Sequence, residues 1–274
     1  MFDPARLDTL GDGWLIRWRG SQRVRHRACV EAVRPLLAGS SGLAVLDIGC
    51  AQSQLLLLLR DQFPGHSYVG ADISKNAVDW NRTHHPSFRY VHGALPSLNL
   101  ESSTLDLVCA LEVIYYLDGD ERSEALLEIA RLLKPGGHAL LSVPLHGMTE
   151  EELLHRTEPG FRHVVLFYNH AALCSRVERH LVKLVHRLLR ASEVASLEDE
   201  PFAAWLGGRR PSLALRVLRL NPLRRILPLL SRRAAQAVLL VLRGTLLPSL
   251  AIGLTRTFAP KAGRSHVIVL AAKR

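Results

Sequence analysis

Two aspartates in the first third of the chain stand near the ends of strand-like segments, where their carboxyl groups could bind a ligand. Asp47 is the one charge in an otherwise apolar run from Leu43 to Ile48, and Gly49 follows directly. Asp72 comes 23 residues after Gly49, near the end of a second strand-like segment. An acid at this distance from a glycine turn is placed to accept hydrogen bonds from both hydroxyls of a ribose. The spacing favours this role for Asp72 over that of a solvated loop residue.

The residues around Asp47 predict a strand, a tight turn and a helix. Residues 43–48 form a short apolar run of the kind that buried strands have, and a helical pattern starts at about Ala51. The free amides at the start of such a helix point at whatever lies above the end of the strand. The sequence therefore predicts a ligand at the edge of a parallel sheet.

Strands and helices are expected to alternate through the next hundred residues. A helix capped by Ser74 follows the second strand, and a helix over 120–133 buries one face through Leu126, Ile129, Ala130 and Leu133. The expected strands cover residues 66–72, 87–91, 105–111 and 138–144. This alternation predicts an α/β fold with a parallel sheet.

Size and cysteine content are those of an ordinary intracellular domain. The chain has 274 residues, 48% of them hydrophobic, which is enough for one α/β domain with additions or for two small domains. Cys29, Cys50, Cys109 and Cys174 are spread singly, without zinc-site spacing. We expect reduced thiols, no metal site, and, since residues 1–14 carry three aspartates and no apolar run, no signal peptide.

The charge is distributed unevenly along the chain. Residues 1–150 carry a net charge of −3 and residues 151–274 one of +13, and residues 201–274 hold 14 basic residues and no acid. These are mostly arginines set among leucines, a pattern that suits an anionic membrane surface better than a nucleic-acid platform. The expected location is therefore cytoplasmic, with peripheral contact to the inner face of a membrane.

Four segments of the chain resemble the ordered motifs of class I S-adenosylmethionine-dependent methyltransferases. They are VLDIGC (45–50), GADIS (70–74), LDLVCALEVIYYL (105–117) and LLKPGGHALLSVP (132–144). The resemblance covers about residues 40–145. It implies a Rossmann-like, seven-stranded, mostly parallel sheet whose last strand is antiparallel. Residues 265–272 are the candidate for that strand, and residues 182–189, after a helix from about Asn169, for the one before it.

The resemblance implies four segments. Residues 1–39 would be an N-terminal helical lid, 40–190 the methyltransferase core, 191–262 a basic and apolar helical insert, and 263–274 the last core strand. In the lid, most of the arginines are expected to face solvent, and the alternative places Arg25 or Arg27 near a ligand carboxylate. Within the insert, we expect the proline-divided stretch 209–260 to lie in a membrane interface. A helical cap over the active site and a dimer interface are the alternatives.

The resemblance also implies roles for individual residues. Asp47 and the turn of Gly49, Cys50 and Ala51 would hold the methionine end of S-adenosylmethionine. Asp72 would bind the ribose. The remaining expected contacts are Ile73 on one side of the adenine, Gly93, Ala94 and Leu95 on its other side, and Ala110, Leu111 and Glu112 facing the sulfonium and the acceptor.

Two departures from the family pattern affect the expected site. The family has Gly-x-Gly-x-Gly in the first turn, whereas this chain has Ala51 and Ser53 at the second and third glycine positions. Each replacement adds a Cβ where the backbone approaches the ligand, and Ser53 is expected to cap the helix instead. Ala94 stands where the family often has an adenine-binding Asp. Losing that hydrogen bond costs about 1.5–3 kcal/mol, or roughly ten- to hundredfold in affinity.

The catalytic candidates are His146 and Tyr115, near the ends of the fifth and fourth strands. Methyl transfer needs alignment of the two reactants, and a general base only if the acceptor must lose a proton. His146 has a pKa range suited to that role, and a solvated loop histidine is the alternative. Tyr115, with Tyr116, would either wall the acceptor pocket or only pack.

The expected function is S-adenosylmethionine-dependent methyl transfer to a small-molecule or lipid-linked acceptor. The alternative is a catalytically degenerate, methyltransferase-like binding or scaffold protein. A nicotinamide enzyme is disfavoured because the first turn is not Gly-x-Gly-x-x-Gly. A nucleic-acid methyltransferase is disfavoured because residues 112–115 read EVIY rather than an Asn/Asp-Pro-Pro-Tyr/Phe motif.

Overall fold

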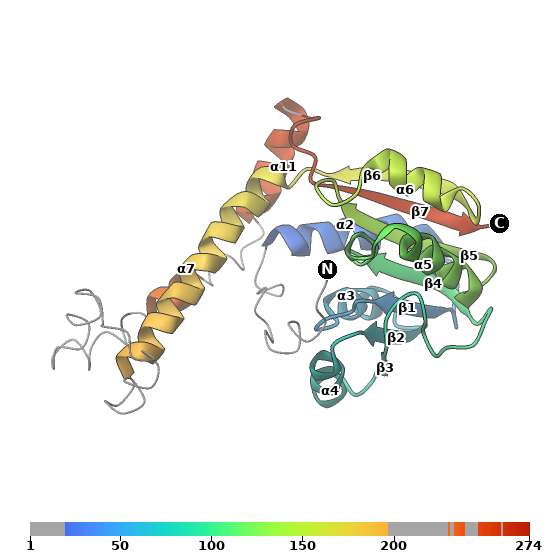
Figure 1. Ribbon diagram of the computed structural model, residues 1–274, viewed down its shortest axis with the longest axis horizontal. Helices are drawn as coiled ribbons and strands as arrows, with labels where there is room; N and C mark the ends of the chain where they lie inside the picture. Colours follow the sequence, from blue (N-terminus) through green and yellow to red (C-terminus); the bar gives the residue numbers. More distant parts are fainter. Residues whose placement is uncertain (1–19, 197–229, 231–232, 239–245, 259) are drawn as a thin grey trace.

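The computed structural model describes residues 20–196, 230, 233–238, 246–258 and 260–274. Its centre is a seven-stranded sheet in the order β3-β2-β1-β4-β5-β7-β6 (Figure 1). The strands are β1 (Ala44–Ile48), β2 (Ser67–Asp72), β3 (Arg89–His92), β4 (Leu105–Leu111), β5 (Leu133–Pro144), β6 (Phe161–Asn169) and β7 (His266–Lys273). The helices are α2 (Gly20–Leu37), α3 (Gln54–Gln62), α4 (Lys75–His84), the 3₁₀ turn η2 (Ile114–Tyr116), α5 (Gly119–Leu132), α6 (Glu150–Thr157), α7 (Ala172–Ser196) and α11 (Leu246–Phe258).

The strand directions confirm the expected fold class. Strands β1 to β5 pair in parallel, whereas β7 pairs antiparallel with both β5 and β6. The predicted last strand is therefore β7, within one residue at each end. From β1 the chain moves outward through β2 and β3, and then returns to place β4 on the other side of β1. The boundary between β1 and β4 is the topological switch point, where ligands of open α/β sheets bind.

The prediction for the sixth strand was wrong. Residues 161–169 form β6, and residues 182–189 lie inside the long helix α7. In that stretch Leu181, Val182 and Val185 fall on one side of a helix and pack together with Ala235 and Val238. The apolar spacing is therefore helical, and the strand is supplied by the apolar run after α6.

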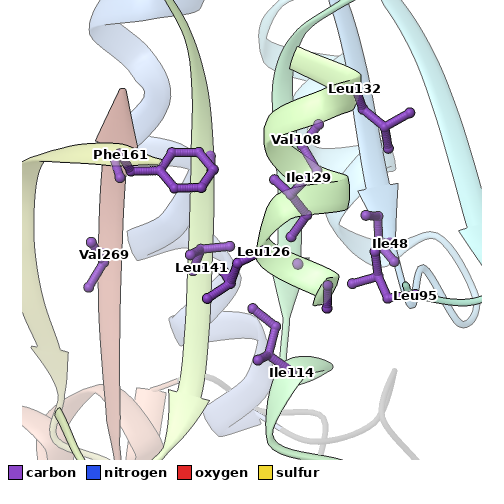
Figure 2. Packing of buried hydrophobic residues seen from close by; sticks show 14 of the residues in the cluster. Ile48, Leu95, Val108, Ile114, Leu126, Ile129, Leu132, Leu141, Phe161 and Val269 are labelled. Atoms are coloured by element: carbon purple, nitrogen blue, oxygen red, sulfur yellow. The ribbon is translucent and has the colours of Figure 1, made fainter. Parts of the chain in front are cut away.

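Helices cover both faces of the sheet. The side chains of α2, α3 and α4 share one buried cluster with the sheet, and those of α5 and α6 share the other. Figure 2 shows the second cluster, in which Leu126 of α5 points toward Leu141 of β5 and Ile129 and Leu132 lie further along the same helix. The predicted buried face of α5 is thus confirmed for Leu126 and Ile129. Leu133 is also buried, but as the first residue of β5.

Helix α7 leaves the edge of the sheet and runs away from it, next to α11 (Figure 1). No helix within the described residues is long and apolar enough to cross a bilayer. The predicted interfacial stretch 209–260 falls mostly outside the described residues. All four cysteines are free thiols, as predicted, and Cys29, Cys50 and Cys109 are buried.

Candidate active site at the switch point

The two predicted aspartates lie at the same edge of the sheet. Asp47 pairs in register with Gly70 of β2 and with Cys109 of β4, so it sits one residue before the end of β1 at the switch point. Asp72 is the last residue of β2 and pairs with His92 at the end of β3. Both carboxyl groups thus stand where the parallel strands end.

The turn after β1 keeps a glycine-type backbone although two of its residues are not glycine. Gly49, Ala51 and Ser53 have φ angles of 72°, 44° and 58°, all in the left-handed region. That conformation costs a non-glycine residue about 1–2 kcal/mol. The side chains expected to disturb the turn are therefore accommodated in it, and the surrounding contacts offset the strain.

Three hydrogen bonds hold the turn in place. The Ala51 amide donates to Oδ2 of Asp72 at 2.8 Å, and Nδ2 of the fully buried Asn81 donates to the Ala51 carbonyl at 2.5 Å. The Ser53 hydroxyl lies 3.0 Å from the Tyr90 hydroxyl. The expectation that Ser53 caps α3 was wrong, because its side chain makes no cap bond and is paired with Tyr90 instead. Ser74 caps α4 as predicted, accepting from the Ala77 amide.

The site is electrostatically prepared for a cation. Burial raises the pKa of Asp47 well above its usual value, and the negative charge of Asp72 raises it further. No described residue gives the Asp47 carboxyl a hydrogen bond or an ion pair, and Oε1 of Gln52, in the turn, is buried without a partner. A positively charged ligand group beside Asp47 would favour its ionised form. S-adenosylmethionine, which carries an ammonium and a sulfonium, fits a site lined by these carboxyl and amide oxygens.

The predicted adenine side is formed by the segment after β3. The Gly93 amide donates to the Asp72 carbonyl at 3.0 Å, which places this segment next to Asp72. Ile73, Gly93 and Ala94 are half-buried, whereas the side chain of Leu95 is buried in the core. Ala110 and Leu111, at the end of β4, are likewise buried, so only their backbone is at the edge of the site.

A buried ionic cluster, which the sequence analysis did not find, stands at the end of β4. Nη1 of Arg25, on α2, lies 3.0 Å from Oε1 of Glu112, and Nε2 of His266, at the start of β7, lies 2.9 Å from the same oxygen. Nη1 of Arg25 and Nε2 of His266 also lie 3.2 Å apart. Arg25 is 4% exposed and forms an ion pair with Glu112. The structure therefore pairs Arg25 with a carboxylate of the protein and not with that of a ligand.

The cluster fixes the charge of its members. Burial alone would raise the pKa of Glu112, but Arg25 and His266 bring it down to about 2. The pKa of His266 is lowered by burial, with Glu112 acting in the opposite direction. Glu112 has a φ of 61°, a strained conformation that directs its side chain into the cluster. The predicted orientation of Glu112 toward the acceptor is therefore replaced by a structural ion pair.

Aromatic residues line the region beyond β4. The rings of Tyr115 and Tyr116 are in contact, with centroids 4.0 Å apart and a tilt of 33° between their planes, and His146 meets Tyr115 edge-on at 6.4 Å. Burial, and then the hydrogen bond with Tyr116, raise the pKa of Tyr115, so its phenol stays protonated at neutral pH. His146 is exposed, on the loop after β5. The two predicted catalytic residues are thus brought together, with only His146 suited to accept a proton.

A surface hollow of about 530 Å³ lies elsewhere, lined by residues from the first half of β5, the start of β6 and the end of β7. Because the parallel strands begin there, it is at the opposite edge of the sheet from Asp47 and Asp72. It takes no part in the candidate site.

Residues 46–141 match the family model described as a methyltransferase domain. This part of the chain is a class I S-adenosylmethionine-dependent methyltransferase domain. It holds most of β1, all of β2 to β4, the turn, Asp72 and most of β5. The cofactor of the family is S-adenosylmethionine, whose positive charges agree with the two carboxyl groups at this edge of the sheet.

Curated relatives of the methyltransferase domain act on different molecules. The chain is 34% identical over 120 residues to the mouse tRNA (carboxymethyluridine(34)-5-O)-methyltransferase ALKBH8, which covers 43% of this chain and 17% of the relative. It is 27% identical over 175 residues to the malonyl-[acyl-carrier protein] O-methyltransferase of Pectobacterium atrosepticum, covering 64% and 66%. The chain thus spans less than two thirds of each of these relatives.

Solved structures share the fold of the methyltransferase domain. The N-methyltransferase NodS of Bradyrhizobium japonicum, in complex with S-adenosyl-l-homocysteine, matches with a TM-score of 0.51 and 18% identity over 60% of this chain and 87% of NodS. The [4+2]-cyclase SpnF matches with a TM-score of 0.51 and 18% identity over 92% and 82%. At this level of identity the likeness concerns the fold alone, on which different reactions are found.

Proposed function

We propose that the chain transfers a methyl group from S-adenosylmethionine to a small-molecule or lipid-linked acceptor. The observation that carries this proposal is the preserved turn between Asp47 and Asp72. Ala51 and Ser53 adopt the glycine conformation, and the Ala51 amide is bonded to Asp72. A site that had lost its ligand would have no functional need to keep two strained non-glycine residues.

The residues of the site have distinct roles in this proposal. Asp47 and the amides of the turn would hold the methionine end, and Asp72 would accept hydrogen bonds from the ribose hydroxyls. Ile73 and the segment 93–95 would enclose the adenine. The cofactor supplies an activated methyl group. The protein's own contribution is to align the acceptor with that group and to exclude water.

His146 is the proposed proton acceptor if the methylated atom carries a proton. Its imidazole stands beside the Tyr115 ring, and histidine is the side chain that most often serves as a general base. The adjacent rings of Tyr115 and Tyr116 would form an aromatic wall of the acceptor site. The raised pKa of Tyr115 keeps its phenol neutral, so the wall carries no charge there. A planar or greasy acceptor suits this wall better than a strongly charged one.

The basic second half of the chain supports two parts of this proposal. One is a lipid-linked acceptor, and the other is a cytoplasmic location in contact with the inner face of a membrane. The 14 basic residues of 201–274 occur without any acid, among many leucines. An enzyme held at an anionic membrane would meet a lipid-linked acceptor there. The acceptors in the names of the relatives, a tRNA nucleoside and an acyl-carrier ester, are the alternatives among which the experiment below decides.

A catalytically degenerate binding protein is the second candidate. Its supporting observation is Ala94, half-buried beside Gly93, which leaves the adenine without the acid that the family often has. This candidate predicts that S-adenosylmethionine is bound weakly or not at all and that no acceptor is methylated.

The test supplies methyl-labelled S-adenosylmethionine with three acceptor pools: a total lipid extract, a small-molecule extract, and a mixture of tRNA and acyl-carrier protein. The proposal expects label in the lipid or small-molecule pool, at least tenfold above that of the Asp72→Asn variant. Label only in the tRNA and carrier-protein pool would overturn the acceptor class. No label in any pool, from a folded protein that binds S-adenosylmethionine weakly or not at all, would favour the catalytically degenerate binding protein.

A further inference from the structure

Exposed apolar side chains gather on the helices that project from the sheet. We call α7 and α11 together the arm; the two helices lie in contact. Leu173, Val177 and Leu184 of α7 and Leu250 and Leu254 of α11 are each between 41% and 59% exposed. Elsewhere among the elements of the sheet and its covering helices, the exposed large apolar side chains are spread over η2, α5 and β6: Tyr116, Leu127, Val164 and Val165. The arm instead gathers five of them on two helices in contact.

The inner face of α7 is fixed to the rest of the molecule. The Glu178 carboxylate accepts hydrogen bonds from the amide and the hydroxyl of Ser21, at the start of α2, the amide at 2.8 Å. A carboxylate there also interacts favourably with the helix dipole. Further along, Val185 is buried against Ala235. The first four turns of α7 therefore have a defined orientation, with one face inward and the other outward.

The outer face of α7 has an apolar stripe beside a basic one. Leu173, Val177 and Leu184 are spaced by four and seven residues, which puts them on one line along the helix. The basic residues follow on one flank of that line: Arg176, Arg179, Lys183 and Arg187, all exposed, with His180 among them. Among the described side chains of α7 the one acid is Glu178, which is buried against α2.

We propose that this outer face of the arm docks on an anionic lipid bilayer. Leucine and valine side chains in line, with long cations beside them, suit the boundary between acyl chains and phosphate groups. Charge complementarity selects the lipid over the other occupants. A second copy of the chain would bring two rows of cations together, and an RNA would leave the apolar stripe exposed to water. The proposal does not depend on methyl transfer, since docking is measured without turnover.

The experiment is flotation of the full chain with vesicles of phosphatidylcholine alone or with 30 mol% phosphatidylglycerol, a composition chosen for strong negative charge. The expected result is binding to the anionic vesicles only, weakened by salt. Val177→Asp with Leu184→Asp, and separately Arg176→Glu with Lys183→Glu, are each expected to lower the bound fraction by more than about tenfold, since each cation near the surface contributes about fivefold. Leu127→Asp on α5 and Arg89→Glu on β3, both exposed and away from the arm, are matched controls expected to bind normally.

Three results would overturn the proposal. The first is no binding to anionic vesicles by a folded wild-type chain. The second is binding that the arm variants leave unchanged or that the controls reduce equally. The third is an arm used for something else: a dimer that dissociates with Val177→Asp and Leu184→Asp while vesicles are ignored, or tRNA binding lost with the charge reversals and unaffected by the apolar ones.

Discussion

The backbone amide of Ala51 donates a hydrogen bond to Oδ2 of Asp72 at 2.8 Å. This contact joins the turn after β1 to the acid at the end of β2, so the methionine and ribose ends of the proposed cofactor site are positioned together. It also explains how a turn with only one of the family's glycines keeps its shape. The left-handed backbone of Ala51 aims its amide at the carboxylate, and the bond offsets part of the strain.

Replacing Ala51 with glycine should stabilise the protein. Ala51 has a φ of 44°, which glycine adopts without steric cost, so Ala51→Gly is expected to raise the free energy of unfolding by about 1 kcal/mol. Urea unfolding measures the change. The matched control is Ala32→Gly in the middle of α2, where the same substitution should destabilise by about 1 kcal/mol. Destabilisation by both variants would contradict the strained turn.

Replacing Gly49 with alanine should have the opposite effect. Gly49 has a φ of 72°, and a Cβ built on it would lie 2.6 Å from Cγ2 of Val113. Strain and overpacking together are expected to cost about 2–4 kcal/mol. Adding Val113→Ala should remove the steric part, so the double variant should be more stable than the sum of the single changes predicts. Simple additivity in urea unfolding would show that the contact is not made.

The charge of Glu112 should make the stability of the protein depend on acid. Its pKa is about 2 in the folded chain and about 4.5 when unpaired, so the stabilisation is complete above pH 4.5 and is lost as the pH falls toward 2. Glu112→Gln leaves Arg25 buried without its anion and should cost about 3–5 kcal/mol at pH 7.

The difference between wild type and Glu112→Gln should shrink when unfolding is measured at pH 3. Glu124→Gln, on the exposed face of α5, is the control and should stay within about 0.5 kcal/mol of wild type at both pH values. A deficit that is constant with pH would show that the ion pair does not account for the loss.

His146 should affect turnover without affecting the cofactor. Its ring lies beside Tyr115, beyond β4 and β5, so His146→Gln is expected to bind S-adenosylmethionine within twofold of wild type. If the acceptor loses a proton, methyl transfer should fall by about 10²–10⁴-fold. The rate of methyl transfer should fall much less in Tyr115→Phe, since a phenol that stays protonated contributes only packing to the site. Equal rates of methyl transfer for His146→Gln and wild type would show that His146 is not the proton acceptor.

The part of the fold that the sequence predicted rests on local patterns. Asp47, Gly49 and Asp72 stand at fixed distances in one strand–turn–helix–strand unit, and Ser74 caps α4 through a residue three positions away. Neighbouring residues determine such features, so they can be predicted from the sequence alone.

The parts that the sequence did not predict depend on contacts between distant residues. Arg25 and His266 are 241 residues apart and meet because β7 returns to the sheet and lies between β5 and β6. Residues 182–189 have enough apolar residues for a strand, but Val182 and Val185 lie on one side of a helix and pack with Ala235, from a distant part of the chain. The same applies to Ser53, whose partner Tyr90 lies on another strand.

The measurement that tests the central claim most directly is titration calorimetry of the full chain with S-adenosylmethionine and S-adenosylhomocysteine. The account predicts micromolar binding of both. Asp72→Ala should weaken it by about a hundredfold, whereas Asp79→Ala, which removes an exposed acid from α4, should bind as wild type does. Absence of binding by a well-folded wild-type chain, or wild-type affinity in Asp72→Ala, would contradict the account.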